Sequence, residues 1–378
     1  MHNQKAGIYI HIPFCQAKCI YCDFYSVADR NNEIPEFLNL ICSEIDLFFK
    51  KNNTPWSFDT LFLGGGTPSL LEASSIEKIL NTLREHLDLS HIQEFTVETN
   101  PGEIDYNRLK DFLSIGVNRL SLGFQSFDDK LLSFLGRLHS SQDCIKTYEN
   151  ARKAGFNNIN ADLIFDIPGQ SIERWKQDLK TLAELNPEHI STYSLTVEKQ
   201  TNLFKLVQSG KVTMPSETID ISMYTHALDF LKQQNYLQYE ISNHSKQNYQ
   251  CKHNLHYWKN DPYISFGPSA HSYDMKRRWW NINNLNQYSE SIKNNKLPIQ
   301  NEEHLTDKDR FNELIFNGLR MQDGVSIENL EKYYNHSIID YIELNTKKWA
   351  GLNCENGFFF LDDNARLLAD EIASDLFI

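Results

Sequence analysis

The sequence predicts an α/β fold built on a parallel sheet, followed by a small winged-helix-like module. Strand-like and helix-like segments alternate six times within the first 240 residues. After residue 300 the pattern changes to three helices and a hairpin. Right-handed crossovers between consecutive strands allow either a doubly wound sheet or a full or partial barrel. In each of these folds, functional residues are expected beyond the carboxyl ends of the strands.

The strands of the first half are expected where short apolar or β-branched runs end in Gly, Asn or Ser. They cover residues 8–12, 60–63, 94–98, 119–124, 158–165 and 189–195. Apolar residues at helical spacing predict the helices between them. These helices cover residues 36–50, 74–87, 105–115, 144–154, 173–185 and 217–233. Each predicted helix therefore follows one predicted strand, as a parallel sheet requires.

The remainder of the chain departs from this alternation. Past about Asn243 it is rich in aromatic residues and Asn, and we expect an excursion there and no further repeat. From Thr306, helices are expected through Met321, from Ser326 and from Ile339, before a hairpin formed by residues 357–361 and 365–368. The expected units are residues 1–240, 241–300 and 301–378.

Composition and charge narrow the class of protein. Of the 378 residues, 40% are hydrophobic and 23% are charged, as in ordinary soluble globular proteins. Since no apolar run approaches the ~18 to 20 residues of a membrane span, we expect a cytoplasmic protein. The net charge of −13 opposes binding to nucleic acid, and the only basic run is residues 276–278.

Three of the seven cysteines lie within eight residues, directly after the first predicted strand. Cys15, Cys19 and Cys22 have the spacing C-x3-C-x2-C, whereas the other four are scattered. Thiols in the cytoplasm stay reduced, so a close group of them indicates a metal site. Zinc usually takes four closed ligands, whereas three thiolates suit an iron–sulfur cubane with one open iron. Zinc and an unligated loop remain as alternatives.

Polar and glycine residues stand at the ends of the next strands. The second strand ends in a Gly-rich turn, and the third and fourth end in Glu98 and Gln125. Asp162 lies within the apolar fifth strand, where a buried carboxylate needs a partner. These groups are expected to point into one mouth. The residues of the Gly-rich turn, which alone could be an ordinary tight turn, are Gly64, Gly65, Gly66 and Thr67.

The cysteine motif after a strand resembles the cluster signature of the radical S-adenosylmethionine (SAM) superfamily. The resemblance implies a partial (β/α)6 TIM-like barrel in which Cys15, Cys19 and Cys22 hold a [4Fe–4S] cluster. SAM would chelate the fourth iron and be cleaved to a 5′-deoxyadenosyl radical. Tyr21, between the last two cysteines, also fits the pattern of the superfamily.

Longer stretches resemble the branch that contains oxygen-independent coproporphyrinogen III oxidases (HemN) and HemW haem chaperones. They read YIHIPFC, GGGTP, ETNP, GFQSF, LGRLH and DLIFDIPG, and the similarity continues through the C-terminal module. From sequence alone, Arg137 could equally be a solvated helix charge. The resemblance implies that SAM is contacted or positioned by Tyr9, Tyr21, Gly64, Gly65, Gly66, Thr67, Glu98, Gln125, Arg137 and Asp162.

Two departures distinguish the chain from the oxidases of this branch. The oxidases have a fourth cysteine two positions after the third, where this chain has Phe24, and an N-terminal extension, where only eight residues precede Tyr9. The resemblance is therefore closest to HemW and implies a protein that binds haem and delivers it to apo-haemoproteins, such as respiratory-chain components. The alternative is a radical SAM enzyme that decarboxylates coproporphyrinogen III.

A second stretch, CKHNLHYW at residues 251–258, matches the H-N-x-x-Y-W signature associated with haem in HemW proteins. An imidazole can bind haem iron, and aromatic rings can pack on the porphyrin. The alternative is a capped helix whose aromatic side chains fill a domain junction. Cys251 and His256 are second-choice ligands, and His271 is expected to be structural. The residues implied to bind haem are His253, Asn254, Tyr257 and Trp258.

The winged-helix-like module raises the idea of nucleic-acid binding, which the acidic charge and the lack of a basic recognition helix oppose. A protein or porphyrin contact is expected instead. A homodimer and peripheral membrane contact through partners are further expectations.

Overall fold

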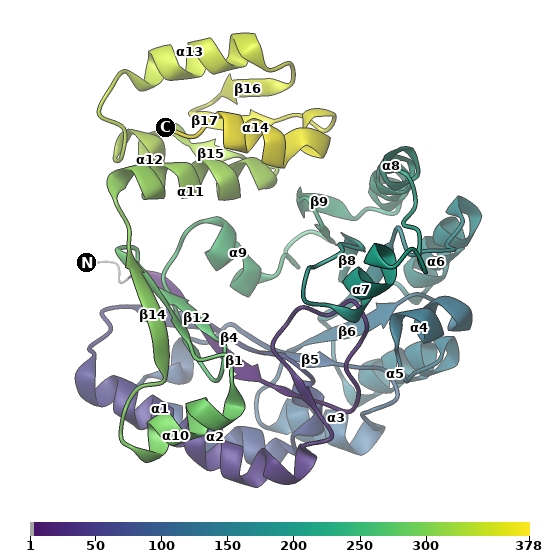
Figure 1. The fold of residues 1–378 in the computed structure, drawn as a ribbon, viewed down its shortest axis with the longest axis vertical. Helices are drawn as coiled ribbons and strands as arrows, with labels where there is room; N and C mark the ends of the chain where they lie inside the picture. The colour runs from purple at the N-terminus through teal and green to yellow at the C-terminus, as the bar shows by residue number, and fades with distance from the viewer. Residues whose placement is uncertain (1–3) are drawn as a thin grey trace.

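The structure is a computed structural model that describes residues 4–378. A long curved sheet has helices along its outer face, and the C-terminal domain stands across its open side (Figure 1). One helix, α9 (Lys252–Trp258), lies between the sheet and that domain and contacts both. Within residues 4–378, none of the helices is long and apolar enough to cross a lipid bilayer.

The large sheet contains twelve strands, and seven consecutive ones, from β11 to β8 in sheet order, are parallel. In sheet order they are β14 (Ile299–His304), β13 (Arg277–Asn281), β12 (His271–Tyr273), β11 (Tyr263–Phe266), β1 (Lys5–Ile12), β4 (Ser57–Gly65), β5 (Glu94–Thr99), β6 (Arg119–Gln125), β7 (Ile159–Phe165), β8 (His189–Ser194), β10 (Asn243–Ser245) and β9 (Leu237–Glu240).

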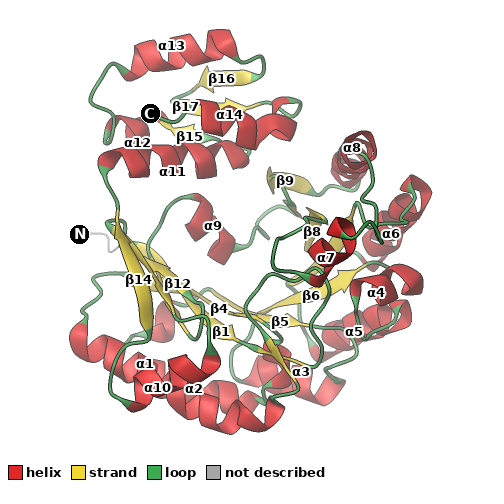
Figure 2. Cartoon of the chain, viewed as in Figure 1, coloured by secondary structure: helices red, strands yellow, loops and turns green. Residues whose placement is uncertain are grey.

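Helices follow the strands in the order that the sequence predicts, and Figure 2 shows the alternation. All six predicted strands and helices of the first half occur with bounds within three residues of the prediction. The helices are α1 (Ile34–Lys51), α2 (Ala73–Arg84), α3 (Tyr106–Ser114), α4 (Asp129–Leu135), α5 (Ser141–Ala154), α6 (Ile172–Leu185), α7 (Asn202–Gln208), α8 (Glu217–Gln233), α10 (Leu285–Lys293), α11 (Asp307–Arg320), α12 (Ile327–Glu331), α13 (Ile338–Lys348) and α14 (Ala369–Asp375).

Local signals explain where these helices begin and end. The Ser140 side chain accepts a hydrogen bond from the Asp143 amide, and Asp143 accepts one from the Ser140 amide, so a capping box starts α5. Gly155, with φ of +118°, ends the same helix in the left-handed conformation that glycine adopts without strain. The predicted helix at residues 144–154 misses only this capped first turn.

The expected excursion after residue 243 instead extends the large sheet. β11 pairs in parallel with β1, and β12, β13 and β14 continue the sheet by antiparallel pairing. These strands have three to six residues, and one reads RRWWN, so they lack the apolar runs that marked the earlier strands. Their place depends on pairing with an edge that is distant in sequence.

The prediction of a hairpin between residues 357–361 and residues 365–368 is wrong. Phe358–Leu361 is strand β17, but it pairs with β16 (Leu352–Glu355) and with β15 (Val325–Ser326). Residues 365–368 form a 3-10 helix. The reason is local: the Asp362 carboxylate accepts hydrogen bonds from the Asn364 and Ala365 amides and starts a helical turn. The three predicted helices of the domain are present.

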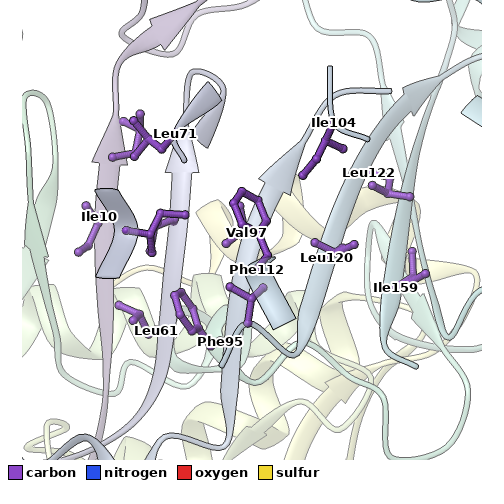
Figure 3. Packing of buried hydrophobic residues seen from close by; sticks show 14 of the residues in the cluster. Ile10, Leu61, Leu71, Phe95, Val97, Ile104, Phe112, Leu120, Leu122 and Ile159 are labelled. Atoms are coloured by element: carbon purple, nitrogen blue, oxygen red, sulfur yellow. The ribbon is translucent and has the colours of Figure 1, made fainter. Parts of the chain in front are cut away.

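The main core lies between the outer face of the sheet and its helices. Alternate residues of successive strands, such as Ile10, Leu61, Val97 and Leu120, point to that side and belong to one cluster with Phe112 of α3 (Figure 3). Burying each such side chain stabilises the fold by roughly 1.5–3 kcal/mol. Since strand side chains alternate, the remaining positions face inward. The inner face is polar in β4–β8, and the site lies there.

Candidate functional site

The cysteine loop lies over the carboxyl ends of the parallel strands. It runs between β1 and α1 and contains the short strands β2 (Phe14–Cys15) and β3 (Val27–Ala28). The Ile20 amide donates to the Leu135 carbonyl at 3.1 Å, and the Ile20 carbonyl accepts from the Leu203 amide at 2.8 Å. These bonds attach the loop to α4 and α7, so the three thiols are held above the strand ends.

A cavity of about 480 Å³ opens beneath this loop, and we call it the cysteine-loop cavity. Within residues 4–378 its lining includes Cys15, Cys19 and Cys22. Most of the predicted SAM residues also line it, namely Tyr21, Gly65, Gly66, Thr67, Glu98, Gln125, Arg137 and Asp162. The expectation that these strand ends share one mouth is therefore met.

Two of the predicted residues, Tyr9 and Gly64, lie beside this lining. The Tyr9 hydroxyl is 3.1 Å from Nδ1 of His11. A Cβ built on Gly64 would stand 3.0 Å from the Tyr9 ring and 3.1 Å from the Glu98 carboxylate. Tyr9 and Gly64 therefore pack against Glu98, which lines the cavity.

The glycine turn brings backbone close to the cavity. Gly65 has a φ of +109°, and a Cβ at this position would approach the His11 ring to 2.5 Å. Its amide donates a 3.0 Å hydrogen bond to the Glu98 carboxylate. Burial, and then repulsion from Asp162, raises the pKa of Glu98 to about 7. The close approach of the His11 ring, together with the positive φ, therefore requires glycine at this position.

Asp162 has the partners that its burial requires. Its carboxylate accepts hydrogen bonds from the Asn160 side-chain amide at 2.7 Å and from the Ser121 hydroxyl at 3.4 Å. Burial still raises the pKa of this carboxyl. Glu98 and Asp162 together place two acidic acceptors on the cavity floor, where hydroxyl groups of a ligand could donate.

Arg137 is bound into the site and is not a solvated helix charge. It follows Gly136, whose φ of +78° ends α4 and returns the chain toward the mouth. Its guanidinium donates to Asn100 Oδ1 at 2.5 Å and to the Gly123 carbonyl at 3.0 Å. A longer contact of 3.5 Å reaches the Cys19 sulfur. Arg137 therefore links the cysteine loop to β5 and β6.

Gln125 occupies an unusual backbone conformation. It ends β6 with a φ of +68°, and the register with β7 shifts between Gly123 and Gln125. A β-bulge of this kind redirects a side chain at a sheet end. Non-glycine residues at positive φ store strain that commonly marks functional positions.

Sequence reasoning missed several residues of this cavity. Asn100 donates to the Thr67 hydroxyl at 3.0 Å and accepts from Arg137, so it joins two predicted residues. It stands in the quoted stretch ETNP directly after β5, a position that could have identified it. Ser121 lies within strand β6 and belongs to no motif, so nothing in the sequence marked it. Tyr193, Ser194 and Glu198 also line the cavity, after or at the end of β8.

The donors of the loop suit an iron–sulfur cluster. All three thiols are free and partly buried. Burial raises the pKa of Cys15 and raises that of Cys22 to about 11, so ligation at neutral pH would release protons. Within residues 4–378, no three His, Cys, Asp or Glu side chains converge on a single-ion site. The ligands of a cubane bind separate irons and do not require such convergence.

The haem-signature stretch forms α9, and its first histidine is buried with both ring nitrogens engaged. Nδ1 of His253 is 2.8 Å from the Thr60 hydroxyl, and Nε2 is 2.8 Å from the Tyr257 hydroxyl. The ring also stacks on Phe62. Burial lowers the pKa of His253, which keeps the ring neutral. Binding of iron in this conformation would require the loss of one of the two hydrogen bonds.

The neighbours of His253 in α9 also have protein partners. His256 lies 2.8 Å from Asp59 and 3.1 Å from Asp261. Burial opposes its charge, but these carboxylates raise the pKa of His256 to about 9. Trp258 lies beneath the Arg320 guanidinium of α11, 5.0 Å from the ring centre. Asn254 is half-buried on the helix.

Comparison with known proteins shows the family. A model of the radical SAM superfamily matches residues 9–182, and one of the HemN C-terminal domain matches residues 305–368. The chain is 36% identical over 369 residues to a protein named heme chaperone HemW from Bacillus subtilis (strain 168), covering 96% of this chain and 97% of that one. The Escherichia coli (strain K12) protein of the same name is 37% identical over 271 residues, covering 70% and 69%.

A solved structure agrees with these matches at the level of the fold. Escherichia coli coproporphyrinogen III oxidase (HemN), described as a radical SAM enzyme, superposes with a TM-score of 0.86. It is 21% identical, with 100% of this chain and 91% of that one covered. On the matched domains and the near full-length similarity to the Bacillus protein, this chain belongs to the HemW family of the radical SAM superfamily.

Proposed function

We propose that this chain is a haem chaperone that binds haem and passes it to apo-haemoproteins, such as components of a respiratory chain. Membership of the radical SAM superfamily implies a [4Fe–4S] cluster and SAM. In this proposal Cys15, Cys19 and Cys22 hold the cluster. When bound, the cluster supplies an electron that can cleave the SAM sulfonium. The proposal does not require that cleavage for haem transfer.

In this proposal, residues of the cysteine-loop cavity bind and position SAM. Glu98 and Asp162 accept hydrogen bonds from ligand hydroxyls, because both carboxylates stand on the cavity floor. Arg137 and Asn100 keep the mouth in one geometry through their mutual hydrogen bond. The bulge at Gln125 directs its side chain to the mouth, and the Gly65 amide holds the Glu98 carboxylate in place. Tyr21 covers the site from the loop.

The observation that carries the assignment is position 24. An exposed Phe24, with 64% of its surface accessible, lines the cavity lip where the oxidases of this branch are expected to have a fourth thiol. The names of the relatives support the same assignment. The chemistry of the cavity supports a second candidate, the radical SAM decarboxylation of coproporphyrinogen III, because this chain has residues at the positions assigned to SAM.

One anaerobic experiment separates the two functions. The reconstituted full chain receives SAM, a reductant and coproporphyrinogen III, and mass spectrometry follows protoporphyrinogen IX and 5′-deoxyadenosine. In parallel, the haem-loaded chain is mixed with apomyoglobin, and the absorption spectrum follows haem transfer. We expect transfer without catalytic formation of protoporphyrinogen. Catalytic turnover, absent in a Cys19→Ala control, would make the chain an oxidase. A chain that binds no haem would refute the chaperone proposal.

A further inference from the structure

A second cavity lies on the inner face of the sheet, on the other side of β1 from the cysteine-loop cavity. It has a volume of about 330 Å³ and is bounded by β11, β12 and β13 and by residues of α9 and α11. We call it the aromatic cavity, because Tyr257, Tyr263 and Tyr273 form its wall. His271 and Arg278 also line it. None of the residues proposed to hold the cluster or SAM lines this cavity.

The strand register explains why these side chains share one face. Tyr263 pairs with Tyr273, Tyr273 with Arg278, and His271 with Trp280. Directly paired residues of neighbouring strands point to the same side of a sheet. The Tyr257 ring meets the Tyr263 ring edge-on at 4.6 Å, and the Tyr263 ring lies 6.0 Å from that of Tyr273. The result is a nearly continuous aromatic wall.

His271 differs from the other histidines near α9 in its hydrogen bonding. Its side chain is exposed at the rim, and its ring stacks on Trp280 at 5.7 Å with an angle of 19°. Among residues 4–378, no hydrogen bond or ion pair engages the ring, and only burial and the charge of Arg278 influence its pKa. Both influences lower the pKa of His271, so the ring is neutral at pH 7 and has an unprotonated nitrogen.

Three other histidines on this face, His253, His256 and His11, have both ring nitrogens engaged. His253 is bonded at both nitrogens to Thr60 and Tyr257, and His256 lies between two carboxylates. The ring of His11 contacts the Tyr25 carbonyl and the Tyr9 hydroxyl. A neutral imidazole that keeps its lone pair is the ligand that haem iron takes from histidine.

The polar groups of the aromatic cavity indicate how a haem would lie. Arg278 is already paired with Glu313 at 2.5 Å, so the cavity offers no unpaired cation to a propionate. The propionates would therefore extend into solvent through the open side, where His271 is exposed. A volume near 330 Å³ is at the small end of ligand pockets, so the wall would cover only part of a macrocycle. Partial cover suits a ligand that is later handed over.

We propose that His271 is the axial ligand of a haem that rests on the aromatic wall of β11–β13. This inference rests on the proposed haem-chaperone function and identifies its binding site. It also gives α9 a different part from the one the signature suggests: His253 positions Tyr257 through their hydrogen bond, and Tyr257 forms one side of the wall. His253 is then a positioning residue, and His271 contacts the iron.

The test is a haem titration of the full chain and three single variants. Absorption spectra give the affinity, and electron paramagnetic resonance reports the axial ligand. The variants are His271→Ala, His253→Ala and His304→Ala, the last being a control because His304 is exposed on the neighbouring strand β14. We expect the control to match the parent chain. His271→Ala should weaken binding at least tenfold and lose the histidine signature, which added imidazole should restore.

Two outcomes would overturn the inference, and they differ from the failure of the proposed function. An unchanged His271→Ala spectrum would show that another group binds the iron. Loss of the histidine signature only in His253→Ala, with circular dichroism and thermal unfolding like those of the parent, would assign the ligand to α9. In both cases the parent still binds haem and the chaperone proposal stands. A parent chain that binds no haem would refute both proposals.

Discussion

The cysteine-loop cavity and the aromatic cavity lie on the same face of one sheet, yet they are built differently. In the cysteine-loop cavity the side chains bond to one another, and Asn100 joins Thr67, which follows β4, to Arg137, which follows α4. In the aromatic cavity the wall consists of ring contacts, and the His271 ring stacks on Trp280 but makes no hydrogen bond or ion pair among the described residues.

This difference suits two kinds of ligand. A network of mutual hydrogen bonds fixes the geometry before a ligand arrives, which favours a cofactor that stays bound. An open aromatic wall with one free imidazole can cover a planar molecule without enclosing it. The comparison therefore predicts that the two sites respond independently to mutation.

The largest expected effect is the complete loss of the cluster. Replacement of Cys19 by Ala removes one of the three proposed ligands, so reconstituted protein should contain almost no iron and lack the cluster absorption. Haem affinity should not change, because the aromatic cavity shares no residue with the loop. Cys42→Ala, on α1, is the control and should retain the cluster. Parallel loss of haem binding would contradict the separation of the two sites.

A smaller effect is expected when the hydrogen-bond network is cut. Arg137→Ala leaves the Asn100 oxygen and the Gly123 carbonyl without their donor. SAM affinity, measured by calorimetry on the reconstituted protein, should fall at least tenfold, or about 1.4 kcal/mol. Arg137→Lys should retain part of it, since an ammonium cannot reproduce the fork of a guanidinium. The exposed Lys130→Ala, on α4, should have no effect; an equal loss there would indicate a general change of α4.

The smallest effect concerns pH and stability. Burial and Asp162 raise the folded pKa of Glu98 to about 7, above the ordinary value of 4.5. Between these values the folded chain holds a proton that the unfolded chain releases, so the free energy of unfolding falls as pH rises through this window. Glu98→Gln removes this contribution, and the variant should gain on the order of 1–3 kcal/mol over the parent at pH 8.

Chemical denaturation at several pH values measures this gain. The gain should shrink toward zero below pH 5, where Glu98 is protonated in both states. Glu44, whose pKa burial also raises to about 7, titrates in both proteins and cancels in the difference. A gain that does not depend on pH would show that repacking, and not titration, causes it. His304→Ala, on the edge strand β14, should leave the pH dependence unchanged.

Much of the cysteine-loop cavity was predictable from the sequence. The spacing of Cys15, Cys19 and Cys22 is local, and one loop brings them together. Glu98, Gln125 and Asp162 are distant in sequence, but parallel strands carry their carboxyl ends to one edge, so the βα alternation was sufficient to group them. Arg137 could not be assigned from sequence, because its role depends on the left-handed Gly136 and on Asn100.

The aromatic cavity depended on tertiary structure. Its strands lack an apolar run, and their place in the sheet follows from the pairing of β11 with β1, more than 250 residues apart. In the sequence, His253 and His271 are both histidines that lie close to aromatic residues. Thr60 and Tyr257 hydrogen-bond to the ring of His253. The ring of His271 makes no hydrogen bond among the described residues and lies at the rim of the aromatic cavity. Sequence alone determined the cysteine motif and the succession of the first six strands and helices along the chain, because both depend on local spacing. Only the tertiary structure determined that the ring of His271, and not that of His253, has no hydrogen-bond partner among the described residues, because that depends on contacts between distant segments.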